Sequence, residues 1–343
     1  MTTEPNPPTT APSGGAPSGV VPPSLAVHLT PEDLRQALER DVRAGLTGTP
    51  KQIPPVYFYD DRGSQLFDAI TRLPEYYPTR CERWILENYA KDMAVVSGAE
   101  VLVELGAGTC DKSRVLLDAL QSTGRLARFV PLDVSASTIW EAAEALSVEY
   151  PGVAVDAVVA DFHRNLGLLP SDGRRLIAFL GGTIGNLHPA ERQRFLVDLD
   201  CAMGSEDRLL LGTDLVKDRE RLVRAYDDSA GVTAEFNRNV LNVLNRELGG
   251  DFDPDRFDHV ARWNEDDQRI EMWLRSTADQ SIHLDDLDLD LTFSAGEEML
   301  TEISTKFTPD QLEAELVACG FVLDATWTSE GGEFQLTLCH PYC

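Results

Sequence analysis

The sequence has few basic residues for its length: 30 Lys and Arg stand against 57 Asp and Glu, giving a formal net charge of −27. A field of that sign repels phosphate backbones, and no basic patch interrupts it, which argues against a nucleic-acid partner. Long apolar runs are also missing, since no stretch approaches the roughly 20 residues of a membrane span. The N-terminus lacks a basic start followed by an apolar stretch, so neither a secretory signal nor a membrane partner is predicted.

Cysteine and histidine are present without the spacings that bind metals. The six cysteines include no Cys-x-x-Cys pair, and the six histidines include no His-x-x-x-His. Gly63-Ser64 lacks the flanking glycines of a serine-hydrolase elbow. We therefore expect no metal, no redox motif and no hydrolase, and we place the protein in a reducing cytoplasm.

The first residues are mostly Pro, Thr, Ser, Gly and Ala. Such a segment buries too little surface to offset its ordering entropy, so residues 1–27 are predicted to be a disordered tail. Order is expected to begin near Leu29. Thr30-Pro31-Glu32-Asp33 then predicts the N-terminus of a helix over about 31–44, with a capping residue, an early proline and acids in the first turn.

From Val101 onward, short apolar stretches alternate with helical patterns. Strands are expected at 101–105, 129–132, 153–159, 176–180 and 208–211, with helices between them, and a helix at 309–319 precedes a strand pair at 322–327 and 334–338. This alternation predicts right-handed crossovers and a parallel, Rossmann-like α/β sheet.

The rhythm changes after Asp214. Charged helices come first, followed by period-two stretches at 269–275 and 282–293. In the second stretch leucines alternate with acids, which predicts an exposed antiparallel strand. We expect these residues to build a second, mixed α+β domain.

Glycines and acids mark the ends of the first three expected strands. Glu104-Leu105-Gly106-Ala107-Gly108 lies between a strand and a helix, where glycines let the backbone approach a ligand. Asp111 stands where a dinucleotide fingerprint needs its third glycine. Asp133 and Asp161 end the next two strands and face the same crevice. Each acid alone could be a strand-end cap, but the ordered set favours a ligand with ribose hydroxyls, an adenine amine and an ammonium group.

This ordered set resembles the class I S-adenosylmethionine (SAM)-dependent methyltransferases. Longer strings narrow the resemblance: Tyr57–Asp60, Gly63–Phe67, Leu73–Arg80, Gly106–Thr109 with Lys112, Phe179–Asn186, Gly212–Asp218, Ala225–Asp227, Ile270–Leu274 and Glu302–Phe307. Together, over about residues 30–340, they resemble the L-histidine Nα-methyltransferases of ergothioneine biosynthesis. Ala107 and Gly182 depart slightly, because serine is expected more often at both positions.

The resemblance implies an activity and a site. Three methyl groups would pass from SAM to the α-amino nitrogen of free L-histidine, giving hercynine and S-adenosylhomocysteine. SAM would be held by Gly106, Lys112, Asp133, Asp161 and Phe162. The pocket for histidine would be lined by Tyr59, Phe67, Tyr76, Gly181, Asn186, Tyr226, Met272, Glu302 and Ser304.

Within that pocket the resemblance implies separate roles. Asn186 and Tyr226 would hold the substrate carboxylate, and Glu302 and Ser304 the imidazole. The chemistry of methyl transfer to an amine adds a catalytic role for Tyr59, which would orient the amine or relay its proton. Glu302 and Ser304 lie two apart, so on a strand they share a face and could read both ring nitrogens.

Plainer interpretations of the same residues stay open. Phe67 has the helical spacing of a core residue, Met272 could fill a gap in the core, and Tyr59 could be aromatic strand filler. Glu302 and Ser304 could sit on a solvated strand face.

We predict a SAM-binding domain over 80–214 plus 307–343, and a substrate-binding domain over 28–79 plus 215–306. The site would lie between them, in a monomer. Rival functions are a methyltransferase for another free amino acid and a non-catalytic SAM-binding regulatory module. A nucleic-acid methyltransferase is disfavoured by the charge and by Gly181–Asn186, which stands in place of an Asn/Asp-Pro-Pro-Tyr/Phe string.

Overall fold

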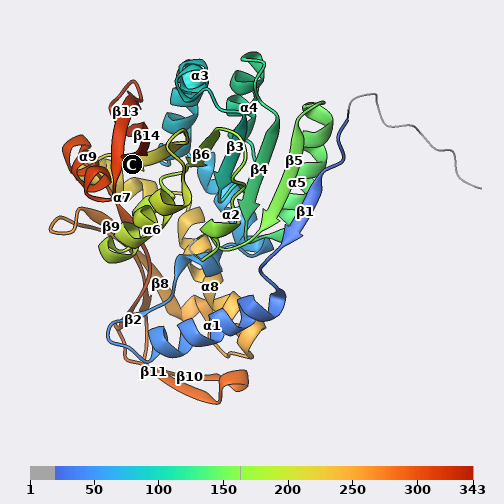
Figure 1. The fold of residues 1–343 in the computed structure, drawn as a ribbon. Coiled ribbons are helices and arrows are strands. Elements are labelled where there is room, and N and C mark those ends of the chain that lie inside the picture. The colour runs from blue at the N-terminus through green and yellow to red at the C-terminus, as the bar shows by residue number, and fades with distance from the viewer. Residues whose placement is uncertain (1–19, 163, 343) are drawn as a thin grey trace, which may run out of the picture.

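The structure is a computed structural model that describes residues 20–162 and 164–342. The chain forms two lobes, with a large sheet and its helices in one and a smaller sheet with its own helices in the other (Figure 1). Among the described residues, no helix is long and apolar enough to cross a lipid bilayer.

The large sheet has eight strands. In spatial order they are β1 (Ser24–Val27), β5 (Ala154–Val159), β4 (Arg128–Asp133), β3 (Val101–Leu105), β6 (Arg175–Phe179), β7 (Arg208–Asp214), β14 (Phe334–Pro341) and β13 (Phe321–Thr328). In this spatial order, all strands from the edge strand β1 as far as β7 are parallel to one another. Strand β14 runs antiparallel to both of its neighbours, β7 and β13. The strands predicted for this sheet are confirmed, with small shifts at their ends.

The strand order reverses at the centre of this sheet. From β3 the chain moves through β4 to β5 on one side, and then returns to β6 on the other side of β3. Ligands of doubly wound sheets bind at such a switch point, outside the carboxyl ends of the strands. The fold therefore directs attention to the turns that follow β3 and β6.

Strand β1 corrects the predicted tail. Ser24–Val27 pairs in parallel with Asp156–Val159, so order begins before Leu29 and the tail does not extend to residue 27. All four residues of β1 are exposed, and its bonds are largely backbone ones, such as that from the His28 N–H to the Val159 carbonyl at 2.8 Å. An edge strand without a buried face leaves no alternating pattern to detect. Residues 1–19 lie outside the described residues.

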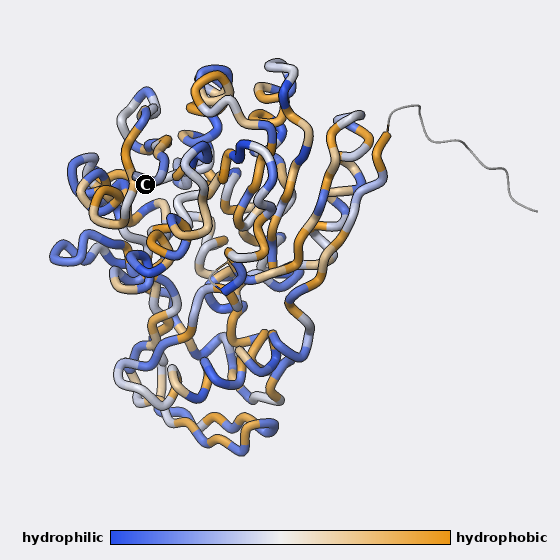
Figure 2. Tube along the Cα trace, in the orientation of Figure 1, coloured by the Kyte–Doolittle hydropathy of each residue, from blue (hydrophilic) through white to orange (hydrophobic). Residues whose placement is uncertain are grey.

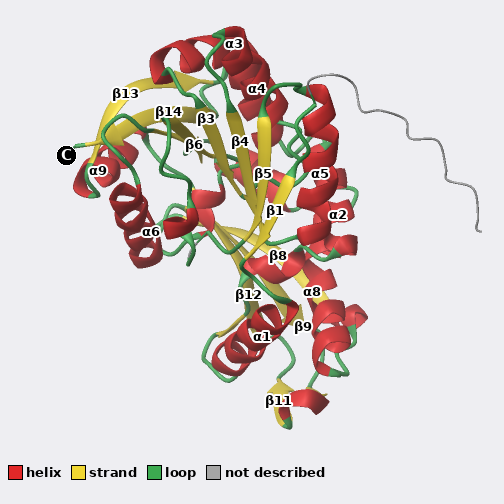
Figure 3. Ribbon diagram, turned by 45° about the vertical axis from the view of Figure 1, so that its right-hand side comes forward, coloured by secondary structure: helices red, strands yellow, loops and turns green. Residues whose placement is uncertain are grey.

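Helices cover both faces of the large sheet (Figure 3). One face carries α3 (Pro78–Ser97), α4 (Ser113–Ser122) and α5 (Ala136–Glu149), and the other carries η2 (Leu166–Leu168), α6 (Pro189–Ala202) and α9 (Pro309–Ala318). Every residue of β3 is buried, as expected for a central parallel strand covered on both sides. Figure 2 shows the corresponding apolar residues along the sheet strands.

The second lobe has its own sheet and core. The sheet runs β2 (Lys51–Gln52), β12 (Glu298–Thr305), β9 (Arg269–Ser276), β8 (Phe257–Asn264). Around it lie α1 (Pro31–Leu46), η1 (Pro55–Phe58), α2 (Asp61–Thr71), α7 (Arg219–Tyr226), α8 (Val232–Leu248) and η4 (Pro254–Arg256). The N-cap predicted at Thr30 is confirmed, and it is part of a capping box in which Thr30 and Asp33 bond reciprocally. The buried core draws on residues 38–77 and 222–299.

The stretch at 282–293 differs from its prediction. It forms a hairpin of β10 (Gln280–Leu284) and β11 (Leu289–Phe293), with the turn η5 (Asp285–Leu287) between them. Leu284, Leu287 and Leu291 are all buried, so the predicted exposed strand is wrong for its apolar face. The leucines therefore face the core, and the acids that alternate with them face outward.

Backbone contacts join the two lobes beside the switch point. The Phe307 N–H donates to the Asp214 carbonyl and the Val216 N–H donates to the Phe307 carbonyl, both at 2.9 Å. Gly185, in the turn η3 (Thr183–Asn186) after β6, is so close to β12 that a Cβ there would come 2.7 Å from the Thr305 carbonyl oxygen. This seam places the end of β12 beside the carboxyl ends of β6 and β7.

Candidate active site

The turn after β3 has the backbone conformation that glycine favours. Gly106 and Gly108 have φ of +71° and +53°, and the Gly106 and Ala107 N–H groups donate to the Leu132 carbonyl. A Cβ at Gly108 would meet no heavy atom within 4 Å, so the turn leaves open space beside it. The loop is thus fixed by β4 and is accessible to a ligand.

Asp133 holds this turn in place. Its Oδ2 accepts from the Gly108 N–H and its Oδ1 from the Ser135 N–H, both at 2.9 Å. The side chain is only half-buried, and each carboxylate oxygen retains capacity for another hydrogen bond. The strand-end cap and the ligand-binding role considered from the sequence are therefore compatible in one residue.

Of the predicted donor-site residues after β5, Phe162 lies beside the same turn. The Phe162 ring packs edge-on against Phe179 with ring centroids 5.2 Å apart, and its Cε1 would lie 3.7 Å from a Cβ on Gly106. Asp161, one residue earlier, lies 3.5 Å from the Arg164 Nε. Glu104 is buried, accepts a bond from the Ser113 hydroxyl, and has its pKa raised to about 7 by burial.

Glu82 is a buried acid that the sequence analysis missed. Its Oε2 accepts from the Lys112 Nζ at 2.5 Å, and its Oε1 accepts from the Gly181 N–H at 2.7 Å. It thereby ties a predicted donor-site lysine to a predicted substrate-site glycine. The sequence did contain a signal for Glu82. It shares one helical face with the apolar Ile85 and Leu86, at the spacing i, i+3, i+4, and a carboxylate on a buried face is unusual.

Aromatic rings form a continuous row in the second lobe. Ring centroids lie 5.5 Å apart for Tyr59 and Phe67, 6.2 Å for Phe67 and Tyr76, and 6.2 Å for Tyr76 and Tyr226. Tyr59 remains 40% exposed, whereas Tyr76 is buried. Phe236 of α8, which the sequence analysis missed, packs 5.7 Å from Tyr59. Phe67 therefore serves the lobe's core while lying beside the exposed Tyr59.

Burial raises the pKa of Tyr76 well above its usual value, and the neighbouring Tyr226, Tyr59 and Glu302 add to the effect. The phenol is therefore neutral at physiological pH. Tyr59 and Tyr226 belong to the same aromatic row as Tyr76.

A row of polar side chains continues the site along β12. Glu302 and Ser304 are 9% and 5% exposed, so the solvated strand face considered for them is wrong. Met272 is 2% exposed and lies directly opposite Glu302 in the β12–β9 register. Burial raises the pKa of Glu302 to about 7, while the charge of Lys306 opposes the rise.

The row ends at a group that sequence analysis also missed. Lys306 is fully buried and donates to both the Tyr226 and Ser304 hydroxyls. These two hydroxyl oxygens lie 2.8 Å apart, although the resemblance assigns them to opposite ends of the substrate. Asn186 closes the η3 turn beside this part of β12 and is half-buried. The sequence signal for Lys306 was its spacing, because it continues the every-second-residue pattern of the polar residues Glu302 and Ser304.

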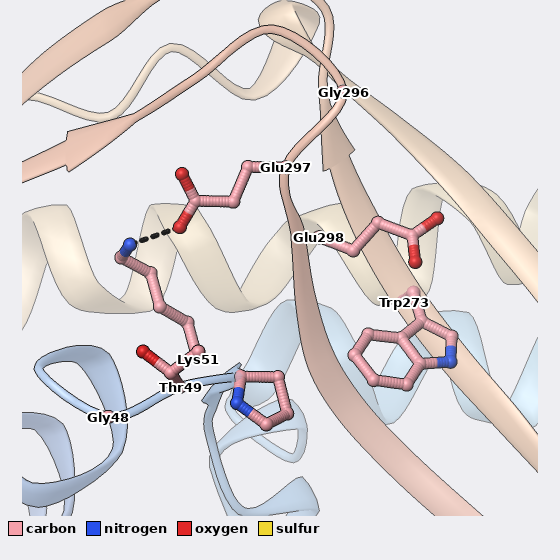
Figure 4. A pocket seen from close by; sticks show the side chains of 8 residues that line it. Gly48, Thr49, Lys51, Trp273, Gly296, Glu297 and Glu298 are labelled. Carbon is pink, nitrogen blue, oxygen red and sulfur yellow. Dashed lines mark hydrogen bonds and ion pairs between the residues drawn. The ribbon is translucent and has the colours of Figure 1, made fainter.

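A separate hollow of about 400 Å³ lies elsewhere on the second lobe (Figure 4). Its lining includes Lys51, Trp273, Glu297 and Glu298, with an ion pair between Lys51 and Glu297. None of the predicted site residues lines it. Trp273 follows Met272 on β9, so alternation along the strand directs the two side chains to opposite faces of the sheet.

A Rossmann-like sheet with a glycine turn at its switch point, and acids ending the next two strands, defines a class I SAM-dependent methyltransferase. Comparison with known proteins gives the family. A sequence model described as "Histidine-specific methyltransferase, SAM-dependent" matches residues 38–341, and the chain belongs to this family.

Two relatives of known activity agree with this assignment. The chain is 55% identical to a histidine N-alpha-methyltransferase of Mycolicibacterium smegmatis and 56% identical to one of Mycobacterium tuberculosis, in both cases over 92% of this chain and 98% of the relative. Among solved structures, a SAM-dependent methyltransferase from Clostridium acetobutylicum matches with a TM-score of 0.45 at 12% identity, covering 81% of this chain and 98% of that one.

Proposed function

We propose that the protein transfers three methyl groups from SAM to the α-amino nitrogen of free L-histidine, giving hercynine, a precursor of ergothioneine. The observation that carries the proposal is the buried Glu302, placed opposite Met272 on the strand whose end packs against the η3 turn. A buried acceptor suits an imidazole N–H, whereas an apolar ring would leave it unpaired. The histidine N-alpha-methyltransferases among the relatives support the same substrate.

The residues around the β3 turn fit SAM. The open space beside Gly108 leaves room for the SAM atoms that would face the backbone, and Asp133 offers acceptors to the ribose hydroxyls. Asp161 and Phe162 would contact the adenine, while Gly106 and Lys112 complete the site. When bound, SAM supplies a methyl group on a positively charged sulfur.

The second lobe, together with the η3 turn of the large-sheet lobe, would hold histidine by both ends. Glu302 and Ser304 would bind the imidazole, Asn186 and Tyr226 the carboxylate, and Tyr59 would orient the amine. Gly181, Phe67, Tyr76 and Met272 would complete the walls. The amine must be neutral and aimed at the methyl carbon, so the residues contribute chiefly positioning and exclusion of water.

Repeated methylation leaves a permanent cation with no N–H to donate. Aromatic faces suit such a cation, at about 0.5–2 kcal/mol per contact. The row of Tyr59, Phe67 and Tyr76 provides rings for this purpose. The two-domain division at 28–79, 80–214, 215–306 and 307–343, the monomeric state and the cytoplasmic location stay predictions.

The direct test is to incubate the full-length protein with excess SAM and each of the twenty amino acids, and then to measure mass gains. We expect histidine alone to gain up to three methyl groups. Preferred methylation of another amino acid would favour the rival methyltransferase. SAM binding without turnover on any amino acid would favour the regulatory module.

A further inference from the structure

Lys306 lies at the centre of a saturated hydrogen-bond cluster. Its ammonium is 2.8 Å from each of three oxygens, which belong to Asp214, Tyr226 and Ser304. An ammonium has three N–H donors and no acceptor, so these partners use all of its capacity. Burial opposes the charged form most strongly of any single cause, but Asp214 and Tyr226 together outweigh it and raise the pKa of Lys306. Lys306 is therefore a fixed cation.

The cluster is anchored in both lobes. Asp214 ends β7 in the large sheet and also accepts from the Tyr77 hydroxyl at 2.8 Å and from Lys217. Tyr226 is held through its backbone as well, since its carbonyl lies 2.8 Å from the Nε2 of His259. The two hydroxyls therefore have little freedom to change partners.

Counting hydrogen bonds shows what this cluster can offer to a ligand. Tyr226 and Ser304 each accept one bond from Lys306, and they share a third bond between their oxygens. That shared bond uses one hydroxyl proton. The other hydroxyl oxygen accepts from both partners, so its own proton must point out of the cluster. Whichever hydroxyl this is, the pair presents a donor.

We propose that Lys306 is a positioning residue that makes the Tyr226–Ser304 pair a hydrogen-bond donor to the substrate. The inference rests on the proposed function, because the substrate is taken to be histidine. With Glu302 two residues away as an acceptor, the pocket then presents a donor and an acceptor side by side. A neutral imidazole is complementary to both groups, because its N–H can donate to Glu302 and its bare nitrogen can accept from the hydroxyl pair. A substrate carboxylate can only accept, so it is complementary to the hydroxyl pair alone.

The test compares Lys306→Met with Lys217→Met. Both substitutions remove one lysine from Asp214, but Lys217 does not contact Tyr226 or Ser304 by any hydrogen bond among the described residues. We expect Lys306→Met to raise KM for histidine about tenfold or more, with KM for SAM changed less than about twofold. Lys217→Met should leave KM for histidine near that of the wild type.

A second comparison separates positioning from general support. In a Tyr226→Phe/Ser304→Ala background, adding Lys306→Met should produce no further rise in KM for histidine, because the lysine would have no hydroxyl left to orient. If Lys306→Met does not fold, Lys306→Arg keeps the charge beside Asp214 while changing the three-way geometry, and should raise the same KM.

Two results would overturn the inference: an unchanged KM for histidine in the folded Lys306 variant, or equal rises in the Lys306 and Lys217 variants. Failure of the wild type to methylate histidine would instead overturn the proposed function. The two failures are distinguishable, since the first requires an active wild-type enzyme.

Discussion

The two halves of the candidate site are built in different ways. The donor half consists of backbone turns at the ends of adjacent strands, with Asp133 holding the Gly108 N–H. The substrate half consists of side chains from distant parts of the chain, because Tyr76, Tyr226 and Ser304 meet only in the folded second lobe. The comparison teaches that each ligand depends on its own set of residues, so single substitutions should impair one ligand more than the other.

The largest effect is expected from Asp133→Ala. This change removes acceptors for ribose hydroxyls, worth about 1.5–3 kcal/mol each, and it also releases the Gly108 and Ser135 N–H groups. Calorimetry with S-adenosylhomocysteine should show affinity reduced by about 100-fold or more. Asp111→Ala, at an exposed acid in the same loop, is the matched control and should leave affinity unchanged. An unaltered affinity in the Asp133 variant would remove it from the donor site.

Glu302→Ala should act on the other ligand. An imidazole N–H left unpaired in a closed pocket costs about 1–3 kcal/mol, which corresponds to a rise of about 5- to 150-fold in KM for histidine. Affinity for S-adenosylhomocysteine should stay constant. Glu298→Ala is the control on the same strand, because Glu298 pairs with Arg262 and Arg275 at the surface. Normal histidine kinetics combined with weak donor binding would reverse our assignment of the two lobes.

The raised pKa of Glu302 predicts a pH dependence of stability. Its folded pKa is about 7 and its usual value is 4.5. A raised folded pKa stabilises the protein below about 4.5, and that contribution is lost as the pH rises through about 7. Glu302→Gln has no such loss.

Between pH 5 and pH 8, the free energy of unfolding of the wild type should therefore fall by about 1–3 kcal/mol relative to Glu302→Gln. Denaturant titrations at both pH values measure the difference. The pKa of Glu104 is raised in the same direction, but Glu104 is present in both proteins, so its contribution to the difference cancels. A constant difference across the range would mean that Glu302 ionises normally.

The smallest effect concerns β1. A protein starting at Ser24 keeps the whole strand and should match the full chain in melting temperature and activity. A protein starting at Thr30 loses the pairing of Ser24–Val27 with β5, and should melt a few degrees lower because the strand contributes backbone bonds but little buried surface. Its donor affinity should fall slightly, since β5 leads to Asp161. Equal melting temperatures would show that β1 adds no stability.

Local patterns in the sequence predicted the strands and the glycine turn around which the donor half is proposed. The glycine turn and Asp133 follow strands whose apolar residues are continuous, so their order along the chain fixes their place at the sheet edge. The strand pair β13 and β14 was predicted for the same reason. The resemblance to a known family, rather than any pattern, supplied the residues of the substrate half.

Long-range contacts explain what could not be predicted. Glu82 and Lys306 are charged residues whose partners lie on other elements, and nothing near them in sequence reveals Gly181 or Asp214 as those partners. Phe236 matches an ordinary helix core position until Tyr59 is placed beside it. Strand β1 depends entirely on pairing with β5.

The site of methylation on histidine tests the central claim most directly. The product formed with excess SAM can be purified and analysed by mass spectrometry and proton NMR. We predict a gain of three methyl groups that give one signal from equivalent methyls on the α-nitrogen, with the imidazole ring unmodified. A methyl group on a ring nitrogen, or a product that stops at one methyl group, would contradict the proposed function and the orientation of histidine between Glu302 and Asn186.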